Sequence, residues 1–297
     1  MGVGEHRPSL EDDRGGTSVR TTTVDITEMK RCGEKIAMLT CYDYPTSVWE
    51  DEAGVDIVFV GDSVGTNVLG YESEKDVTLA DMIHHLKAVR RGVKRAYLLV
   101  DLPYLTYDSP EDALRNARSL ISHGADGVKL EGFRPDIVSH LVQDGIQVCA
   151  HLGLNPQIHE TKGLRAKTAR AAKRLISESV ALQDAGAWLM VYELIPEEVA
   201  REATRRLSIP TIGIGAGRHT DGQVLIVSDM LGINDFDLRH VRKYDNLHDR
   251  ASQAIRRHVA EVRSAEFPAG ENVRHLSDEE SKALDSILSA AEARNQG

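Results

Sequence analysis

The stretch that decides the fold runs from Ala96 to Gly132 and reads AYLLVDLPYLTYDSPEDALRNARSLISHGADGVKLEG. It opens with an apolar run of strand length, AYLLV, and closes with another, GVKL. Between the two runs, Ser109 followed by Pro110 marks the start of a helix, and Gly124 marks its end. The stretch therefore predicts one strand–helix–strand unit of a parallel sheet.

The same alternation of apolar runs and helical segments recurs along the chain. The runs are almost continuously apolar, which is typical of parallel strands covered on both faces. Eight such units without a compositional break favour a closed (β/α)8 barrel over an open doubly wound sheet. The runs are Ile36 to Thr40, Ile57 to Val60, Ala96 to Val100, Gly127 to Leu130, Gln147 to Ala150, Trp188 to Tyr192, Thr211 to Ile214 and Val224 to Val227.

Both ends of the chain depart from this pattern. Residues 1–19 are polar, Gly-rich and without periodicity, which predicts a disordered leader. Beyond Pro268, Ser277 and Glu280 form a capping-box pattern that precedes apolar residues at helical spacing. We therefore expect the barrel over residues 20–268 and a tail with a short helix over residues 269–297.

Composition and charge exclude several classes of function. The 297 residues carry 36 Lys and Arg against 46 Asp and Glu, a net charge of −10 at pH 7. An acidic chain of this kind repels nucleic acids and anionic lipid surfaces, so neither is an expected partner. No window approaches 18 uninterrupted apolar residues, and the first residues lack the apolar region of a secretory signal. The sequence predicts a cytoplasmic protein.

Ionisable residues lie at or just after the ends of the predicted strands. Catalytic groups of (β/α)8 barrels sit at the carboxyl ends of the strands, so these residues are expected to meet at one mouth. A single acid in such a place is commonly a helix cap, but six ionisable groups at one mouth favour a site. The set comprises Asp62 with the neighbouring Ser63, Asp101, Lys129, Glu131, His151 and Glu193.

Asp62 and Asp101 are candidates to share one hard cation. They end neighbouring strands, and parallel neighbours lie about 4.8 Å apart. Mg²⁺ commonly binds through one or two carboxylates and keeps its other positions for water and substrate oxygens. Glu131, one strand further on, either binds the ion directly or accepts a hydrogen bond from a metal water. Zinc is less expected, because the 12 His are scattered.

A small 2-oxo acid matches such a cation. Its carboxylate and keto oxygens chelate the metal, which acidifies the neighbouring C–H bond. Glu193, across the barrel on the sixth strand, is the candidate base. Lys129 and His151 would carry or neutralise charge on the resulting enolate. The residues thus predict enolisation of a small anionic substrate.

Seven motifs, taken in order and spacing, closely resemble those of the ketopantoate hydroxymethyltransferase family. The likeness runs from about Thr22 to Pro268. The motifs are MLTCYDYPT (Met38 to Thr46), VGDSVG (Val60 to Gly65), VTLADMIHHLKAVRRG (Val77 to Gly92), DLPY (Asp101 to Tyr104), GVKLEG (Gly127 to Gly132), AHLGLNPQ (Ala150 to Gln157) and GIGAGRHTDGQVLI (Gly213 to Ile226).

The resemblance implies a (β/α)8 TIM barrel of the phosphoenolpyruvate mutase/isocitrate lyase type. It implies transfer of a hydroxymethyl group from 5,10-methylenetetrahydrofolate to 3-methyl-2-oxobutanoate, giving 2-dehydropantoate for pantothenate and coenzyme A biosynthesis. The family assembles as large homo-oligomers, so an octamer or a decamer is implied.

The resemblance also assigns roles to residues of this chain. Asp62 and Asp101 look like the Mg²⁺ ligands, and Glu131 looks like the partner of a metal water. The remaining roles are binding of the oxo acid by Ser63, Lys129 and His151, deprotonation of its branched carbon by Glu193, and lining of the pocket by Tyr42.

Two loops depart from the family's pattern and leave the acceptor open. Residues Ile158 to Ala169 read IHETKGLRAKTA where the family usually has a Gly-Gly-Tyr-containing lid, and residues 72–76 read ESEKD where it has close to DSTLP. Both loops should border the pocket mouth, so a paralogue acting on a different 2-oxo acid is one alternative. A C–C lyase or mutase of the same superfamily is another. A non-catalytic scaffold is disfavoured, because buried carboxylates without a metal or proton task are costly.

Overall fold

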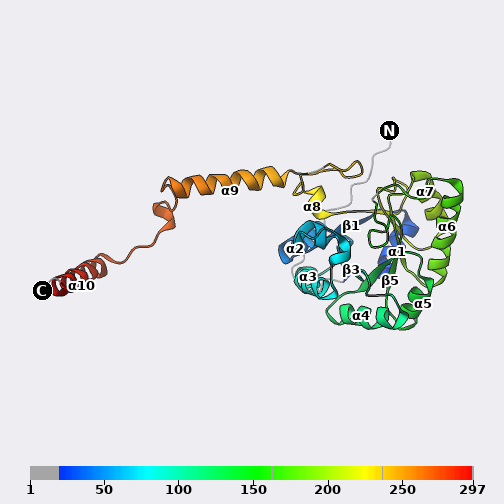
Figure 1. Ribbon diagram of the computed structural model, residues 1–297, viewed down its shortest axis with the longest axis horizontal. Helices are drawn as coiled ribbons and strands as arrows, with labels where there is room; N and C mark the ends of the chain where they lie inside the picture. The colour runs from blue at the N-terminus through cyan, green and yellow to red at the C-terminus, as the bar shows by residue number, and fades with distance from the viewer. Residues whose placement is uncertain (1–19, 162, 236, 296–297) are drawn as a thin grey trace. The chain divides into compact units, whose positions relative to one another are not determined.

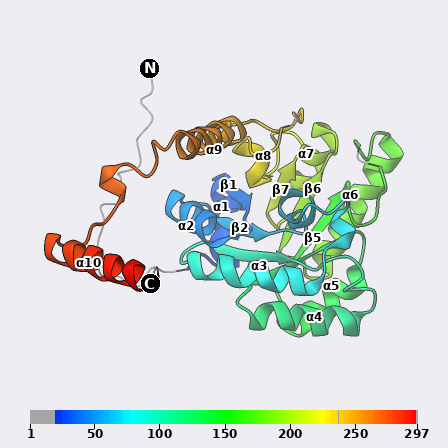
Figure 2. The ribbon, with the colours of Figure 1, turned by 60° about the vertical axis from the view of Figure 1, so that its left-hand side comes forward.

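A computed structural model describes residues 20–161, 163–235 and 237–295 of the chain (Figures 1 and 2). The chain divides into two compact units, with the boundary between Asp245 and Asn246. The leader predicted over residues 1–19 lies outside the described residues. Among the helices that the structure describes, none combines the length and the apolar character needed to cross a membrane.

The first unit is a closed barrel of eight parallel strands in sequential order, which confirms the predicted fold class. Strand β8 begins at Gly222, two residues before the predicted run, because Gly222 pairs with Ile36 of β1. The strands are β1 (Ile36–Thr40), β2 (Ile57–Val60), β3 (Tyr97–Asp101), β4 (Gly127–Glu131), β5 (Val148–Gly153), β6 (Leu189–Glu193), β7 (Thr211–Ile214) and β8 (Gly222–Leu225).

Helices connect successive strands from β1 to β7 and cover the outside of the barrel, whereas the residues between β7 and β8 form a loop instead of the expected helix. Helices α3, α4 and α5 lie in sequence around one side (Figure 2). Thr78 caps α3 through the predicted capping box with Asp81, and Ser109 caps α4, which starts at Pro110. The helices are α1 (Thr23–Cys32), α2 (Tyr44–Ala53), α3 (Leu79–Gly92), α4 (Pro110–Ser122), α5 (Pro135–Gln143), α6 (Ala169–Asp184), α7 (Glu197–Arg206) and α8 (Val227–Met230), with short turns η1 (Gly65–Leu69) and η2 (Glu74–Asp76).

The strands separate two apolar layers, one inside the barrel and one beneath the helices. In β3, Leu98 and Val100 pack in the outer layer, and Leu99 packs in the inner layer. Side chains two residues apart in a strand point to the same face, so Asp101 continues the inner row that contains Leu99. The same alternation aims the charged residues near the ends of β4, β5 and β6 into the barrel.

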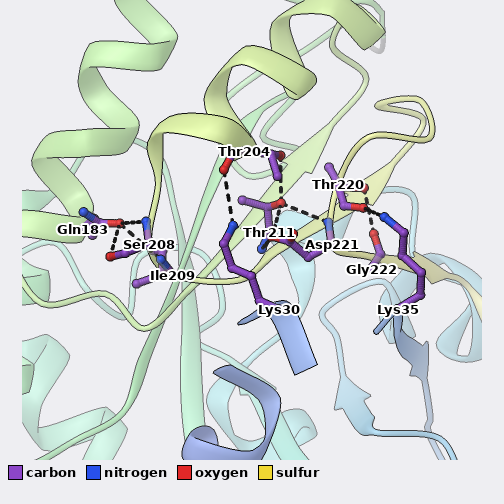
Figure 3. A network of polar contacts seen from close by, with 10 residues as sticks. All are labelled: Lys30, Lys35, Gln183, Thr204, Ser208, Ile209, Thr211, Thr220, Asp221 and Gly222. Atoms are coloured by element: carbon purple, nitrogen blue, oxygen red, sulfur yellow. Dashed lines mark hydrogen bonds and ion pairs between the residues drawn. The ribbon is translucent and has the colours of Figure 1, made fainter. Parts of the chain in front are cut away.

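The amino end of the barrel is fastened by polar contacts between α1 and the start of β8 (Figure 3). Lys30 Nζ lies 2.8 Å from Asp221 Oδ2. The same Asp221 oxygen accepts a hydrogen bond from the Thr211 N–H at 2.8 Å, and Lys35 Nζ donates to the Thr220 carbonyl at 2.6 Å. These contacts hold the first residues of β7 and β8 at the end opposite the polar strand ends.

The second unit contains α9 (Leu247–Arg263), the turn η3 (Gly270–Asn272) and α10 (Asp278–Asn295). Helix α10 occupies the segment for which the sequence predicts a helix, and the Glu280 N–H donates to Ser277 Oγ at 3.3 Å. Residues 246–268, expected within the barrel, group with this second unit instead. The reason is that no residue of α9 is buried, and the described barrel core ends at Leu231.

Candidate active site

A cavity of about 370 Å³ opens among the carboxyl ends of the strands. The register of the strands places the predicted residues next to each other on neighbouring strands, Asp101 beside Lys129 and Glu131 beside His151. The structure thus brings together the six ionisable groups and the serine that the sequence singles out. The predicted residues lining the cavity are Asp62, Ser63, Asp101, Lys129, Glu131, His151 and Glu193.

A larger cavity of about 770 Å³ lies along β1 and β8. Its lining includes Lys35, Glu197 and Arg218, but none of the residues predicted to carry the chemistry. Size alone does not make an active site, so the smaller cavity, with its convergent polar groups, is the candidate.

Lys129 lies at the centre of the charged cluster and is buried. Its Nζ is 2.6 Å from Asp101 Oδ1 and 3.8 Å from Glu131 Oε1. It also lies 5.2 Å from the centroid of the Phe59 ring, which adds a cation–π contact. Burial lowers the pKa of Lys129, but the neighbouring carboxylates outweigh burial and raise this pKa above its ordinary value. The ammonium group therefore stays charged and can meet an anionic ligand.

His151 bridges two carboxylates of different exposure. Its Nδ1 lies 3.3 Å from Glu131 Oε1, and its Nε2 lies 3.5 Å from Glu193 Oε2. The Glu131 side chain is 2% exposed, whereas that of Glu193 is 20% exposed. Burial raises the pKa of Glu131, but its contacts with His151 and other donors bring this pKa below its ordinary value. The imidazole thus connects a fixed anion to the acid that faces the cavity.

Asp62 and Asp101 are joined directly, since the Asp62 N–H donates to Asp101 Oδ2 at 3.0 Å. Asp62 Oδ2 also accepts a hydrogen bond from Gln157 Nε2 at 2.7 Å. Burial, followed by the charges of Asp101 and Glu131, raises the pKa of Asp62 well above its ordinary value. Burial also raises the pKa of Asp101, although Lys129 opposes the shift. Both shifts come first from burial, and the charge of Glu131 adds to each of them.

This donor set fits a divalent cation. The three buried carboxylates face one ammonium group, so two negative charges are in excess when all the acids are ionised. A divalent cation offsets that excess, and hard cations prefer carboxylate oxygens. No group of three or more His, Cys, Asp or Glu in the described ranges is arranged to hold a metal ion by itself. Mg²⁺ commonly binds through only one or two carboxylates and keeps water at its other positions, so Asp62 and Asp101 are the candidate pair and the contacts of Glu131 favour an indirect role.

Tyr42 is the one predicted pocket residue that lies a layer further back. It is buried and is absent from the described lining of the cavity. Its hydroxyl lies 2.8 Å from Ser63 Oγ, and Ser63 lines the cavity. Tyr42 therefore contacts the site through Ser63, because its side chain packs in the layer beneath the helices.

The two divergent loops contribute unequally. Glu74, from the 72–76 loop, is buried and lines the cavity, so this loop borders the pocket as predicted. The described residues of 158–169 supply no lining side chain, and Ile158 is half exposed. Gln157, immediately before that segment, donates a hydrogen bond to Asp62, a contact that the sequence does not predict. The position of Gln157 at the end of the AHLGLNPQ motif is its only signal in the sequence.

The closed barrel and the acidic cavity at the carboxyl ends of its strands define a protein with the architecture of (β/α)8-barrel enzymes. Among solved structures, the barrel is similar to 2,3-dimethylmalate lyase, which is a member of the phosphoenolpyruvate mutase/isocitrate lyase superfamily. The TM-score is 0.55 at 15% identity, over 90% of this chain and 98% of that one. At this identity the likeness shows the fold alone.

Sequence comparison identifies the particular family. The signature of ketopantoate hydroxymethyltransferase matches residues 20–270. The chain is 48% identical to the 3-methyl-2-oxobutanoate hydroxymethyltransferase of Dehalococcoides mccartyi over 84% of this chain and 92% of that relative. It is 45% identical to the enzyme of the same name from Deinococcus radiodurans over 88% of this chain and 96% of that relative. The chain belongs to the ketopantoate hydroxymethyltransferase family and is a transferase.

Proposed function

We propose that the enzyme transfers a hydroxymethyl group from 5,10-methylenetetrahydrofolate to 3-methyl-2-oxobutanoate with the help of Mg²⁺, using Glu193 as the base. The observation that carries this proposal is the buried cluster of three carboxylates around Lys129, with the partly exposed Glu193 in the same cavity. Family membership supports the acceptor and the transferred group.

Asp62 and Asp101 are the residues that would hold the cation. When bound, Mg²⁺ withdraws electron density from the keto group and acidifies the adjacent C–H bond. The protein contributes the fixed positions of both carboxylates, since Asp101 is tied to Lys129 and to the Asp62 N–H. Such fixed partners reduce the reorganisation needed when charge develops.

Lys129 and Ser63 are placed to receive the anionic acceptor. The charged ammonium group of Lys129 faces the cavity and stabilises the negative charge that develops on the enolate. The Ser63 hydroxyl is oriented by Tyr42 and provides a neutral hydrogen-bonding group beside Asp62. His151 lies between Glu131 and Glu193 and separates the two carboxylates. It remains a polar neighbour of Glu193 while that carboxylate takes up and releases the substrate proton.

Glu193 removes the proton from C3 of the oxo acid, and the electrons of that C–H bond form the enolate. Water hydrolyses the methylene bridge of the folate: its oxygen becomes that of formaldehyde, both carbon–nitrogen bonds break, and the two water protons go to the two nitrogens of tetrahydrofolate. The enolate carbon then adds to the formaldehyde carbon, and the resulting alkoxide takes up the proton that Glu193 removed, which regenerates the carboxylate. The products are 2-dehydropantoate and tetrahydrofolate. A carboxylate partly shielded from water is suited to this proton transfer.

A product assay tests the proposal. Formation of 2-dehydropantoate should require both 3-methyl-2-oxobutanoate and 5,10-methylenetetrahydrofolate. Glu193→Gln should lower turnover by orders of magnitude with the fold intact, because it removes a transition-state interaction. Glu198→Gln, with the same charge change at an exposed position of α7, is the matched control. Product formation at the wild-type rate by Glu193→Gln would reject the role of the base.

A different 2-oxo acid is the second candidate acceptor, favoured by Glu74. This acid comes from the divergent 72–76 loop and lines the cavity, where Thr66 Oγ1 donates to it at 3.2 Å. A lyase reaction is disfavoured, because the loop that follows β5 contains no cysteine between Leu154 and Ala169. An assay in which several 2-oxo acids compete with 3-methyl-2-oxobutanoate for the enzyme identifies the preferred acceptor. A higher kcat/KM for another acid would identify the paralogue.

We also propose a homo-oligomeric assembly, an octamer or a decamer. Two large aromatic side chains of α2 support a subunit contact, because Tyr44 is 51% exposed and Trp49 is 60% exposed. Analytical ultracentrifugation should give a mass of eight or ten times the 32.7 kDa chain. A monomeric mass at micromolar concentration would contradict this expectation.

A further inference from the structure

Gln157 is a buried amide that lies behind the acidic cluster. It belongs to the loop after β5 and is 1% exposed. Its Nε2 donates to Asp62 Oδ2 at 2.7 Å and to the Leu102 carbonyl at 3.1 Å. Its Oε1 accepts a hydrogen bond from the Tyr107 hydroxyl. Both amide protons and the amide oxygen are therefore engaged.

The orientation of this amide follows from its neighbours. The carbonyl of Leu102 can only accept, so it requires the NH2 end of Gln157. The Tyr107 hydroxyl receives the Glu131 N–H at 3.4 Å and directs its own proton to Gln157 Oε1. Burial raises the pKa of Tyr107 above its ordinary value, which keeps this donor protonated. If the amide were flipped, Gln157 Oε1 would face the Asp62 carboxylate oxygen and the Leu102 carbonyl oxygen, and neither of these can donate a hydrogen bond.

The same residue also contacts a second acid of the cluster. The Gln157 backbone N–H donates to Glu131 Oε2 at 3.0 Å. One loop residue thus holds Asp62 through its side chain and Glu131 through its main chain. The side-chain bond engages one Asp62 oxygen and leaves the other for a ligand in the cavity. Outer partners of this kind orient metal ligands and tune their affinity.

We infer that Gln157 is a positioning residue, which fixes the Asp62 carboxylate for the divalent cation while Tyr107 fixes the Gln157 amide. The inference rests on the proposed role of Asp62 as a ligand. Gln157 acts through Asp62 and not by contact with the substrate. Loss of its amide should therefore weaken cation binding, and it should have little effect on the proton transfer by Glu193 once the cation is bound.

Titration with Mn²⁺, followed by the electron paramagnetic resonance of the free ion, measures this effect without catalysis. Gln157→Leu keeps the backbone contact to Glu131 but removes the amide, and should raise the Kd for Mn²⁺ by about 10- to 100-fold. Tyr107→Phe keeps the amide but frees its orientation, and should raise the Kd by roughly 2- to 10-fold. In turnover assays, saturating Mn²⁺ should restore most of the kcat lost by Gln157→Leu.

Ser179→Ala is the matched control. Ser179 is a buried polar residue of α6 that bonds to the Leu175 carbonyl and to the Tyr192 hydroxyl, outside the described lining of the cavity. Its loss should cost stability and leave the Kd for Mn²⁺ unchanged within about twofold.

Three results decide the matter. If wild-type protein binds no Mn²⁺, the proposed metal site fails, and this inference fails with it. If wild-type protein binds Mn²⁺ and Gln157→Leu binds it equally well, only the role of Gln157 is overturned. If Gln157→Leu does not fold, Tyr107→Phe decides, and an unchanged Kd in that variant overturns the inference.

Discussion

Glu50 on α2 offers a quantitative test of how the barrel tolerates a buried acid. It is 5% exposed, and neither carboxyl oxygen has a hydrogen-bond partner within the described chain. Burial, followed by the charge of Asp43, raises the pKa of Glu50 from its ordinary 4.5 to about 9, and the Cys41 thiol offsets part of the shift. At neutral pH the side chain is therefore protonated in the folded protein and ionised in the unfolded chain.

The sign of the pH dependence follows from these two values. Stability that comes from the protonated carboxyl is fully present below pH 4.5 and is lost as the pH rises to about 9. Each pH unit in this window is worth up to about 1.4 kcal/mol of unfolding free energy. A rise from pH 5 to pH 8 therefore costs the wild-type protein up to about 4 kcal/mol through Glu50 alone.

Glu50→Gln removes this titration and keeps the shape of the side chain. Urea unfolding at pH 5 and pH 8, followed by circular dichroism, gives the free energies of unfolding. The free energy of unfolding of the variant minus that of wild type should increase by up to about 4 kcal/mol from pH 5 to pH 8. Glu52→Gln is the control at an exposed position of the same helix. Its difference in unfolding free energy from wild type should change by less than about 0.5 kcal/mol between the two pH values. A difference between Glu50→Gln and wild type that is the same at both pH values would refute the reasoning.

Three further outcomes are expected. Lys129→Met leaves Asp101 and its neighbours without their buried cation and should destabilise the protein by about 3 to 5 kcal/mol in urea unfolding; unchanged stability would contradict the ion pair. Mg²⁺ at a hundred times its Kd should stabilise wild type by about 2.7 kcal/mol, and an equal gain in Asp101→Asn would exclude Asp101 as a ligand. Tyr42→Phe removes the contact that orients Ser63 and should raise the KM for the oxo acid by roughly 2- to 10-fold, so an unchanged KM would show that the contact has no role in binding.

The sequence predicts most of the barrel because its signals are local. The apolar runs of the strands stand out, since both of their faces are buried, as Leu98 and Leu99 illustrate on opposite sides of β3. The inward direction of Asp101 follows from a period of two along the same strand. The convergence of the charged residues then follows from the rule that strand ends of a barrel share one mouth.

The loops were less predictable, because their contacts depend on side chains far apart in the sequence. The bond between Gln157 and Asp62 joins residues 95 positions apart, and no spacing pattern indicates it. The place of Tyr42 behind Ser63 and the burial of Glu74 depend in the same way on packing between loops. The end of the barrel unit at Asp245 was also missed, since α9 has a regular helical pattern yet buries none of its residues.

Exchange of the C3 proton of 3-methyl-2-oxobutanoate for deuterium, followed by proton NMR without any folate, tests the enolising site most directly. With Mg²⁺, the wild-type enzyme should exchange this proton. Glu193→Gln and Asp62→Asn should slow the exchange by orders of magnitude, and removal of Mg²⁺ with EDTA should do the same. Exchange at the wild-type rate in Glu193→Gln, or without any divalent cation, would contradict the proposed chemistry.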